Sequence, residues 1–280
     1  MRDHVLGLDH IVIAVSNFTV SAERWQALGF TVSPRGLHSD YLGTANHTIM
    51  FEDDYVELLG VLAATEFNAP TRAFLADGAG LERLAMRTDD AEAGLAALKR
   101  DGFEGSTGPF EFRRPVDLEG GRTGEAGFRI FQWPLEPAPG GARLFACQHL
   151  TRETVWLPSL VEHRNGARAL KRIEIVAADP RTEAELCARL LSLSVGERDG
   201  ACTVAMRPRG ADLVFVDATR FAQRWGRNPG DALPPCGVVL ACDDFARAQP
   251  FAEWTGPGGL PCAAVDGALI GWETAPRRPD

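Results

Sequence analysis

The 280-residue sequence lacks several features that would define a class at once. It has no apolar run long enough to span a membrane, and its first residues lack the long apolar core of a signal peptide. Positive charge is in deficit, because 29 basic residues face 38 acidic ones and the net charge is −9. This balance argues against a nucleic-acid partner. We therefore expect a cytoplasmic protein that engages neither nucleic acid nor membrane.

The six cysteines also lack a pattern. None belongs to a Cys-x-x-Cys pair, and all of them lie at or after Cys147, widely spaced. Such spacing does not frame a disulfide-stabilised domain, so we interpret them as reduced and mostly buried thiols. The sequence also contains no P-loop, dinucleotide-binding glycine motif or nucleophile elbow.

What the sequence does contain is a weak fourfold repeat. Each copy starts with an apolar strand that ends at a short acid or amide suited to cap a helix. A helix and then short alternating strands follow. A unit of this kind has one apolar sheet face that it cannot bury alone, so units must pair. The opening strands are predicted at residues 8–15, 81–87, 170–177 and 237–242.

The predicted fold class is therefore α+β, with tandem βαβββ units that pair into two domains. We place the first domain at residues 1–156 and a connection at 157–169. A second domain of the same type, with fewer polar strand residues, occupies 170–280.

Two polar residues stand out within apolar strands. His10 lies in LDHIVIAV, residues 8–15, and Glu57 lies in YVELLGV, residues 55–61. If these strands are neighbours, the imidazole and the carboxylate form half of a metal site. The alternatives are a hydrogen-bonded core histidine and a carboxylate that either faces solvent or is paired.

These strands and three further segments resemble the vicinal oxygen chelate superfamily, and within it the glyoxalase-like domain proteins. The likeness covers nearly all of the first domain and is fainter for residues 170–280. It implies a sheet curled around a cavity, with a divalent metal held by residues from the first and last strands of each paired unit. The further segments are HSDYLGTAN (38–46), CQHLT (147–151) followed by Val155-Trp156, and HRNGA (163–167).

By this resemblance, His10 matches the first-strand ligand and Glu57 the last-strand ligand. The second unit departs from the pattern, because Arg83 occupies the first-strand position and a guanidinium cannot ligate a cation. Its last strand offers Gln148 and His149, and strand alternation points only one of them inward. The predicted ligand set is His10, Glu57 and His149, for Fe, Zn, Mn or Ni.

Other polar residues are candidates for substrate contacts. An arginine on a cavity-facing strand needs an anion, so Arg83 is expected to contact either Glu57 or an acidic group of the substrate. For the loop residues the alternative is a structured turn. The candidates are His38, Asn46, Arg83, Gln148 and His163.

The sequence thus leaves two classes of function open. The first is a metal-dependent lyase, isomerase or dioxygenase acting on a small oxygenated metabolite, with Glu57 and His10 as catalytic residues. The second is a metal-free protein that binds or sequesters a small molecule, of the bleomycin-resistance type. In both, the partner is a small molecule, anionic if Arg83 meets it, and a homodimer stays open.

We expect the function to reside in the first domain. In the second domain Arg172 occupies the position of His10, and Glu273 is the only surviving acidic match. These two residues are predicted to form a structural ion pair, without a metal, in a centre that is filled or apolar.

Overall fold

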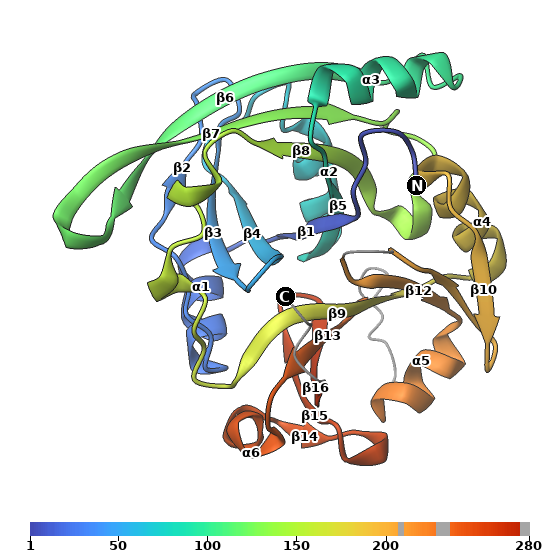
Figure 1. The fold of residues 1–280 in the computed structure, drawn as a ribbon. Helices are drawn as coiled ribbons and strands as arrows, with labels where there is room; N and C mark the ends of the chain where they lie inside the picture. The colour runs from blue at the N-terminus through green and yellow to red at the C-terminus, as the bar shows by residue number, and fades with distance from the viewer. Residues whose placement is uncertain (207–209, 228–235, 275–280) are drawn as a thin grey trace.

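The computed structural model describes residues 1–206, 210–227 and 236–274. Two eight-stranded mixed sheets with interspersed helices make up this part of the chain (Figure 1). The α+β class and the tandem βαβββ units are confirmed, since each sheet is built from two consecutive units. Within the described ranges, no helix is both long enough and apolar enough to cross a membrane.

The first sheet has the strand order β2-β3-β4-β1-β5-β8-β7-β6. The first strands of its two units, β1 and β5, pair antiparallel at its centre. The first unit comprises β1 (Leu8–Ala14), α1 (Phe18–Ala27), β2 (Gly36–Leu37), β3 (Thr44–Met50) and β4 (Tyr55–Val61). After α2 (Ala69–Asp77), the second comprises β5 (Gly80–Arg87), α3 (Ala91–Arg100), β6 (Thr107–Leu118), β7 (Arg122–Gln132) and β8 (Arg143–His149).

The second sheet repeats this plan in the order β10-β11-β12-β9-β13-β16-β15-β14. Its first strand begins within the segment predicted as a connection. One unit comprises β9 (Ala167–Val176), α4 (Pro180–Leu191), β10 (Val195–Arg198), β11 (Ala201–Val204) and β12 (Asp212–Val216), followed by α5 (Ala218–Trp225). The other comprises β13 (Cys236–Cys242), α6 (Phe245–Ala248), β14 (Trp254–Thr255), β15 (Pro261–Val265) and β16 (Ala268–Thr274).

Short polar side chains begin the four repeated helices, as the sequence pattern predicts. Asn17 accepts a hydrogen bond from the backbone of α1, and Asp90, Asp179 and Asp244 do the same for α3, α4 and α6. Each cap satisfies backbone N–H groups that the first helical turn leaves without partners. The chain therefore leaves each opening strand in the same way.

One face of each sheet packs against the other sheet. Ile11 and Ile13 of β1 belong to the same apolar core as Ile173 of β9 and Val238 of β13. Val12, between the two isoleucines, belongs instead to a second cluster on the opposite face of the first sheet. Strand alternation thus divides each strand between a shared core and a separate concave face.

The ends of the first sheet approach each other. β2 and β6 stand at opposite ends of the strand order, yet a Cβ placed on Gly36 of β2 would lie 2.6 Å from Nη1 of Arg114 on β6. Figure 1 shows the long β6–β7 hairpin sweeping across β2 and β3. The sheet therefore curls around its concave face.

Some elements differ from the sequence-based expectation. Short alternating strands were predicted to follow each helix, but residues 30–33 after α1 are irregular, and β2 begins only at Gly36. The helices α2 and α5 were not predicted, and β6 and β7 are much longer than the apolar patches suggest. Pairing between β6 and β7 maintains the extended backbone even where the side chains are exposed.

Candidate functional site

A cavity of about 80 Å³ lies on the concave face of the first sheet. This volume admits several water molecules or the polar end of a small ligand, since one water needs about 10–15 Å³ on this measure. Aromatic and aliphatic side chains form most of its wall. The chemically informative residues in the wall are His10, His38, Asn46, Glu57, Arg83 and Arg114.

His10 and Glu57 face each other across two parallel strands. Nε2 of His10 lies 3.5 Å from Oε2 of Glu57, so the predicted proximity is confirmed. Asn46 of β3 donates a hydrogen bond of 2.8 Å from Nδ2 to the other carboxylate oxygen. Both His10 and Glu57 are buried, at 2% and 8% exposure. Three neighbouring strands thus hold a carboxylate and an imidazole together in an apolar setting.

Asp9 supports His10 from the other side of the imidazole ring. Its Oδ2 lies 2.9 Å from Nδ1 of His10 and also 2.9 Å from Nε2 of His149. Its Oδ1 accepts a hydrogen bond of 2.9 Å from Arg87. A register shift between Leu8 and His10 in the pairing of β1 with β5 lets these adjacent residues contact each other. Asp9 therefore fixes the orientation of the His10 ring.

The buried charges shift one another's pKa values. Burial alone would raise the pKa of Asp9, but His149 and His10 lower it well below its usual value. Burial would lower the pKa of His10, but the hydrogen bonds to Asp9 and Glu57 raise it instead. Burial would raise the pKa of Glu57, but chiefly His10 lowers it to about 2. The pair therefore favours an imidazolium beside a carboxylate.

Two guanidinium groups border the same cavity. Arg83 forms an ion pair with Glu82 and donates a 3.0 Å hydrogen bond to Thr71, rather than contacting Glu57 directly. Arg114 projects from β6, and its buried Nε has no hydrogen-bond partner. Among the residues that the structure describes, no carboxylate lies within 4.0 Å of the Arg114 guanidinium. Burial lowers the pKa of both arginines, which Glu57 partly offsets.

His38 lies in the cavity wall as a neutral side chain. Its Nδ1 lies 2.7 Å from the Thr44 hydroxyl. Burial lowers the pKa of His38 to about 4, and the nearby arginines add to this effect. At neutral pH it can therefore serve a ligand as a hydrogen-bonding group without charge.

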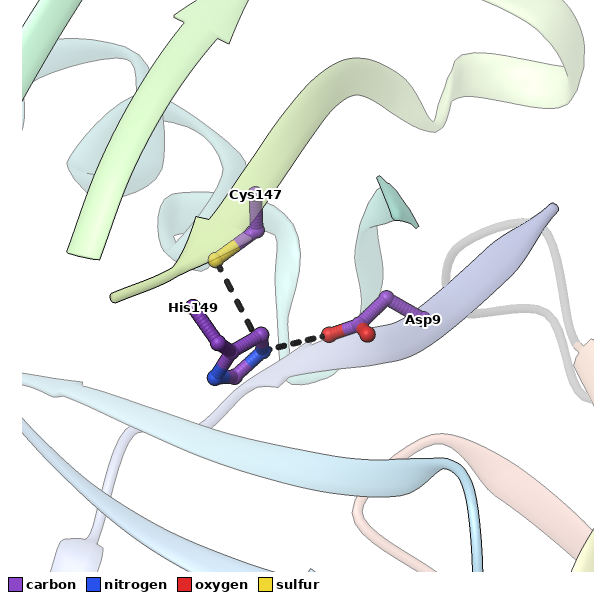
Figure 2. A group of neighbouring side chains, drawn as sticks. All are labelled: Asp9, Cys147 and His149. Atoms are coloured by element: carbon purple, nitrogen blue, oxygen red, sulfur yellow. Dashed lines mark hydrogen bonds and ion pairs between the residues drawn. The ribbon is translucent and has the colours of Figure 1, made fainter. Parts of the chain in front are cut away.

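Figure 2 shows the group formed by Asp9, Cys147 and His149, whose potential ligand atoms lie within 4.8 Å of one another. Cys147 and Asp9 both approach the same ring nitrogen, Nε2 of His149, at 3.9 and 2.9 Å. A nucleophilic triad needs the two ring nitrogens to serve different partners, so this arrangement is not one. Burial also raises the pKa of Cys147 well above its usual value, which maintains the thiol form.

The residues present do not supply a complete ligand set for a resident metal. The distance between His10 and Glu57 suits two ligands of one ion. His149 lies on the far side of the His10 ring, however, where Asp9 bonds its Nε2. In the described part of the chain, no three His, Cys, Asp or Glu groups that include Glu57 meet within ligand distance.

The cluster in Figure 2 is a poor substitute for that site. Arg87 already binds Asp9, so a cation there would face a guanidinium and would also have to displace the Cys147 proton. The same contacts are explained as a buried carboxylate neutralised by three donors, Arg87, His10 and His149.

Two predicted substrate contacts lie away from the cavity. The amide of Gln148 accepts from the backbone of Ala91 and donates to the carbonyl of Asp89, so it joins β8 to the start of α3. His163 accepts from the Thr31 backbone and donates to the Met50 carbonyl. Strand alternation sends Gln148 outward, and His163 serves as a buried link between segments.

Sequence reasoning missed two residues of the site. Asp9 was overlooked because strict alternation puts it on the opposite face from His10, and only the bulge changes this. Arg114 was overlooked because its charged neighbourhood on β6 does not show which face is inward. The weak available signal was the alternation of Phe112, Arg114 and Val116, all half-buried between exposed neighbours.

The centre of the second sheet differs from the expectation. The predicted pair of Arg172 and Glu273 is present. The expected filled or apolar centre is wrong, because a hollow of about 380 Å³ is lined by these residues, Glu174 and Arg224. Glu174 accepts hydrogen bonds from Arg172, Arg224 and Trp225, the last at 3.0 Å.

Comparison with known proteins agrees with this geometry. A family model described as a glyoxalase-like domain matches residues 8–191, more than half of the sequence. The chain therefore belongs to the glyoxalase-like domain family. No curated protein matches the sequence.

Solved structures show the same fold at low sequence identity. A hypothetical protein from Staphylococcus aureus aligns with a TM-score of 0.70 and 13% identity, over 96% of this chain and 99% of its own. A mutant 4-hydroxymandelate synthase from Streptomyces coelicolor aligns with a TM-score of 0.56 and 11% identity, over 98% of this chain and 93% of its own. The Mn(II)-bound glyoxalase from Novosphingobium aromaticivorans aligns with a TM-score of 0.52 and 11% identity, over 97% of this chain and 82% of its own.

Proposed function

We propose that this protein is an enzyme that binds a small oxygenated carboxylate in the first-sheet cavity and moves a proton on it. The observation that carries the proposal is Arg114 beside the His10–Glu57 pair: the residue is half-buried, its buried Nε has no hydrogen-bond partner, and no carboxylate of the described residues lies within 4.0 Å of its guanidinium. A partly buried cation without a counter-ion is costly, and a carboxylate bound by its fork of donors reduces that cost.

Asn46 adds a second element of recognition. Nδ2 of Asn46 donates to the Glu57 carboxylate, which can only accept. Oδ1 of Asn46 therefore faces away from Glu57, and it is buried without a hydrogen-bond partner. A ligand hydroxyl or enol would satisfy this acceptor. Oδ1 of Asn46 and Nη1 of Arg114 both border the space beside Gly36. A 2-hydroxy carboxylate, or the enol form of a 2-oxo carboxylate, therefore has the matching chemistry.

The His10–Glu57 pair supplies the proton chemistry. A carboxylate with a pKa of about 2 is a weak base, but a bound anion nearby raises that pKa by charge repulsion. Glu57 then accepts a proton from the carbon next to a carbonyl, and His10 donates one to the carbonyl oxygen. The C–H bond breaks, an O–H bond forms, and the product is an enol. Isomerases and lyases share this step.

A metal-dependent reaction is the second candidate, because the distance between His10 and Glu57 suits a divalent ion. Relatives in the fold include a Mn(II)-bound protein. The third ligand would have to come from elsewhere than His149, whose Nε2 is bonded to Asp9. Calorimetry with Mn²⁺ and Zn²⁺ tests this version. Binding that is lost in His10→Ala and Glu57→Gln would support it.

Binding and hydrogen exchange of pyruvate in D₂O test the main proposal. We expect pyruvate to bind, and its methyl protons to exchange faster with the enzyme than without it. Arg114→Gln should weaken binding at least about 100-fold, as loss of a buried ionic partner does. Glu57→Gln should bind but not exchange. Arg100→Gln, on the exposed face of α3, is the matched arginine control and should change neither.

The same experiment distinguishes an enzyme from a metal-free sequestering protein. Binding without exchange would contradict the enzyme and favour a metal-free sequestering protein. Equal pyruvate binding by Arg114→Gln and the unmodified protein would contradict the anion site altogether.

A further inference from the structure

A second hollow adjoins the cavity on the outer side of Arg114. It has a volume of about 390 Å³ and is bordered by β6, by the segment before β2 and by residues 154–160. Thr48, Arg114 and Val155 line both this outer groove and the inner cavity. One guanidinium therefore stands at the boundary between two adjoining spaces.

The outer groove differs in character from the cavity. Its wall is rich in aliphatic side chains, and the polar His10–Glu57 pair does not reach it. Leu37 is 51% exposed at this wall. The aliphatic residues used in the argument below are Leu37, Val116, Leu157 and Leu160.

The alternation of β6 creates this arrangement. Phe112 faces the inner cavity, Arg114 faces both spaces, and Val116 faces the outer groove. Successive inward positions on a strand lie about 6–7 Å apart, so these three side chains form one line from the inner cavity to the outer groove, with the single charge in the middle. A ligand that holds its carboxylate on Arg114 can thus direct the remainder of its structure outward along β6.

We infer that the ligand is a carboxylate that bears an apolar chain, with its head in the inner cavity and its chain in the outer groove. This inference rests on the proposed anion site and adds the class of substrate. A chain would cover the exposed Leu37, and the gain would come from removing apolar surface from water. A short, fully polar acid would leave the outer groove unused.

Calorimetric titration with unbranched carboxylates from propanoate to decanoate tests the inference. Affinity should rise about fourfold for each added methylene, the factor expected for full burial, until the groove is filled. Primary alcohols of equal length should bind far more weakly, because they lack the anion. Arg114→Gln should weaken every carboxylate by a similar factor.

Leu37→Asn tests the groove itself. This variant should reduce the affinity for decanoate at least fivefold and leave propanoate unchanged. Leu62→Asn is the matched control, because Leu62 is 53% exposed outside both spaces, and it should behave as the unmodified protein does. Thermal melting confirms that both variants are folded.

Each remaining outcome decides the matter. Carboxylate binding that does not change with chain length would overturn the inference and leave the proposed function standing. Absence of binding at every length, pyruvate included, would overturn both. A change of oligomeric state in Leu37→Asn, seen by light scattering, would assign the groove to a second copy of the chain and so overturn the inference.

Discussion

The two sheets carry the same fold but balance their central charges differently. In the second sheet Glu174 accepts from two arginines, and Glu273 pairs with Lys171 and Arg172, so each of these charges has a partner. In the first sheet the cavity contains Arg114, whose guanidinium has no carboxylate within ion-pair distance among the described residues. Every charge of the second centre has an oppositely charged side chain as partner, whereas Arg114 of the first has none among the described residues, and we propose that a ligand supplies it.

The histidines sharpen this contrast. All six precede residue 164, so the second sheet has none. Two of them, His38 and His163, have pKa values lowered to about 4, chiefly by burial. Mild acid should therefore destabilise the part of the protein that contains the histidines before it destabilises the second sheet.

The largest expected effect is a loss of stability in mild acid. The unfolded chain protonates these histidines near pH 6.5, whereas the folded protein keeps them neutral to about pH 4, so unfolding takes up protons in this window. Stability should fall as the pH decreases from 6.5 to 4, by about 3 kcal/mol for buried His163 and less for the more accessible His38. Urea unfolding at several pH values measures this. His10, with its raised pKa, loses stabilisation only above pH 6.5.

His163→Gln provides the control, because the amide can keep one hydrogen bond but does not titrate. The variant should lose stability at pH 7 and show a shallower pH dependence. An unchanged slope between pH 6.5 and 4 would contradict the role given to His163.

The next effect concerns the buried carboxylates of the two centres. Asp9→Asn and Glu174→Gln each remove a buried carboxylate, leave its arginine donors without that charged partner, and should each cost about 3 kcal/mol of unfolding free energy. Only Asp9→Asn should also lower the pKa of His10, measured by NMR of the imidazole, and weaken carboxylate binding. Equal effects of both variants on binding would remove the functional distinction between the sheets.

The arginines give an opposite pair of effects. Arg114→Gln should weaken pyruvate binding about 100-fold and leave the melting temperature unchanged or higher, because the charge it removes has no internal partner. Arg224→Gln should lower the unfolding free energy by about 2 kcal/mol and leave binding unchanged, because it removes two hydrogen bonds to Glu174. Calorimetry and urea unfolding measure the two quantities. A loss of binding in Arg224→Gln and a loss of stability in Arg114→Gln would instead assign the binding site to the second sheet and the structural role to the first.

The smallest effect is expected at Gly36. An alanine Cβ would lie 2.5 Å from Oδ1 of Asn46 and 2.6 Å from Nη1 of Arg114, both at the ends of side chains that can shift. Gly36→Ala should therefore reduce carboxylate affinity about fivefold with little change in stability, as titration and thermal melting would show. Gly105→Ala, with its nearest contacts beyond 3.3 Å, is the control and should change neither. Unchanged affinity would place the carboxylate elsewhere in the cavity.

The sequence revealed what depends on local patterns. Alternating and continuous apolar runs predicted the opening strands, and acids or amides after them predicted the helix starts. The position of His10 and Glu57 in such strands predicted their proximity on the condition that the strands are neighbours, which the resemblance implied and the parallel pairing of β1 and β4 produces.

Features that depend on distant contacts were not accessible in this way. The bulge that brings Asp9 beside His10 arises from pairing with β5, more than 70 residues later. His163 resembles a site residue in the sequence, but its partners are backbone groups of Thr31 and Met50. The length of β6, and hence the position of Arg114, is set by its hairpin with β7 and not by its own apolar content.

The placement of Arg114 on an edge strand has a consequence for how such a protein can change. The strand that β6 pairs with is β7, so substitutions along β6 leave the pairing of β1 with β4, which hold His10 and Glu57, untouched. A lineage could therefore vary the ligand that the cavity selects by altering a single hairpin, while the pair proposed to transfer protons and its support from Asp9 stay constant. In the proposed enzyme, selectivity and reactivity would depend on separate strands.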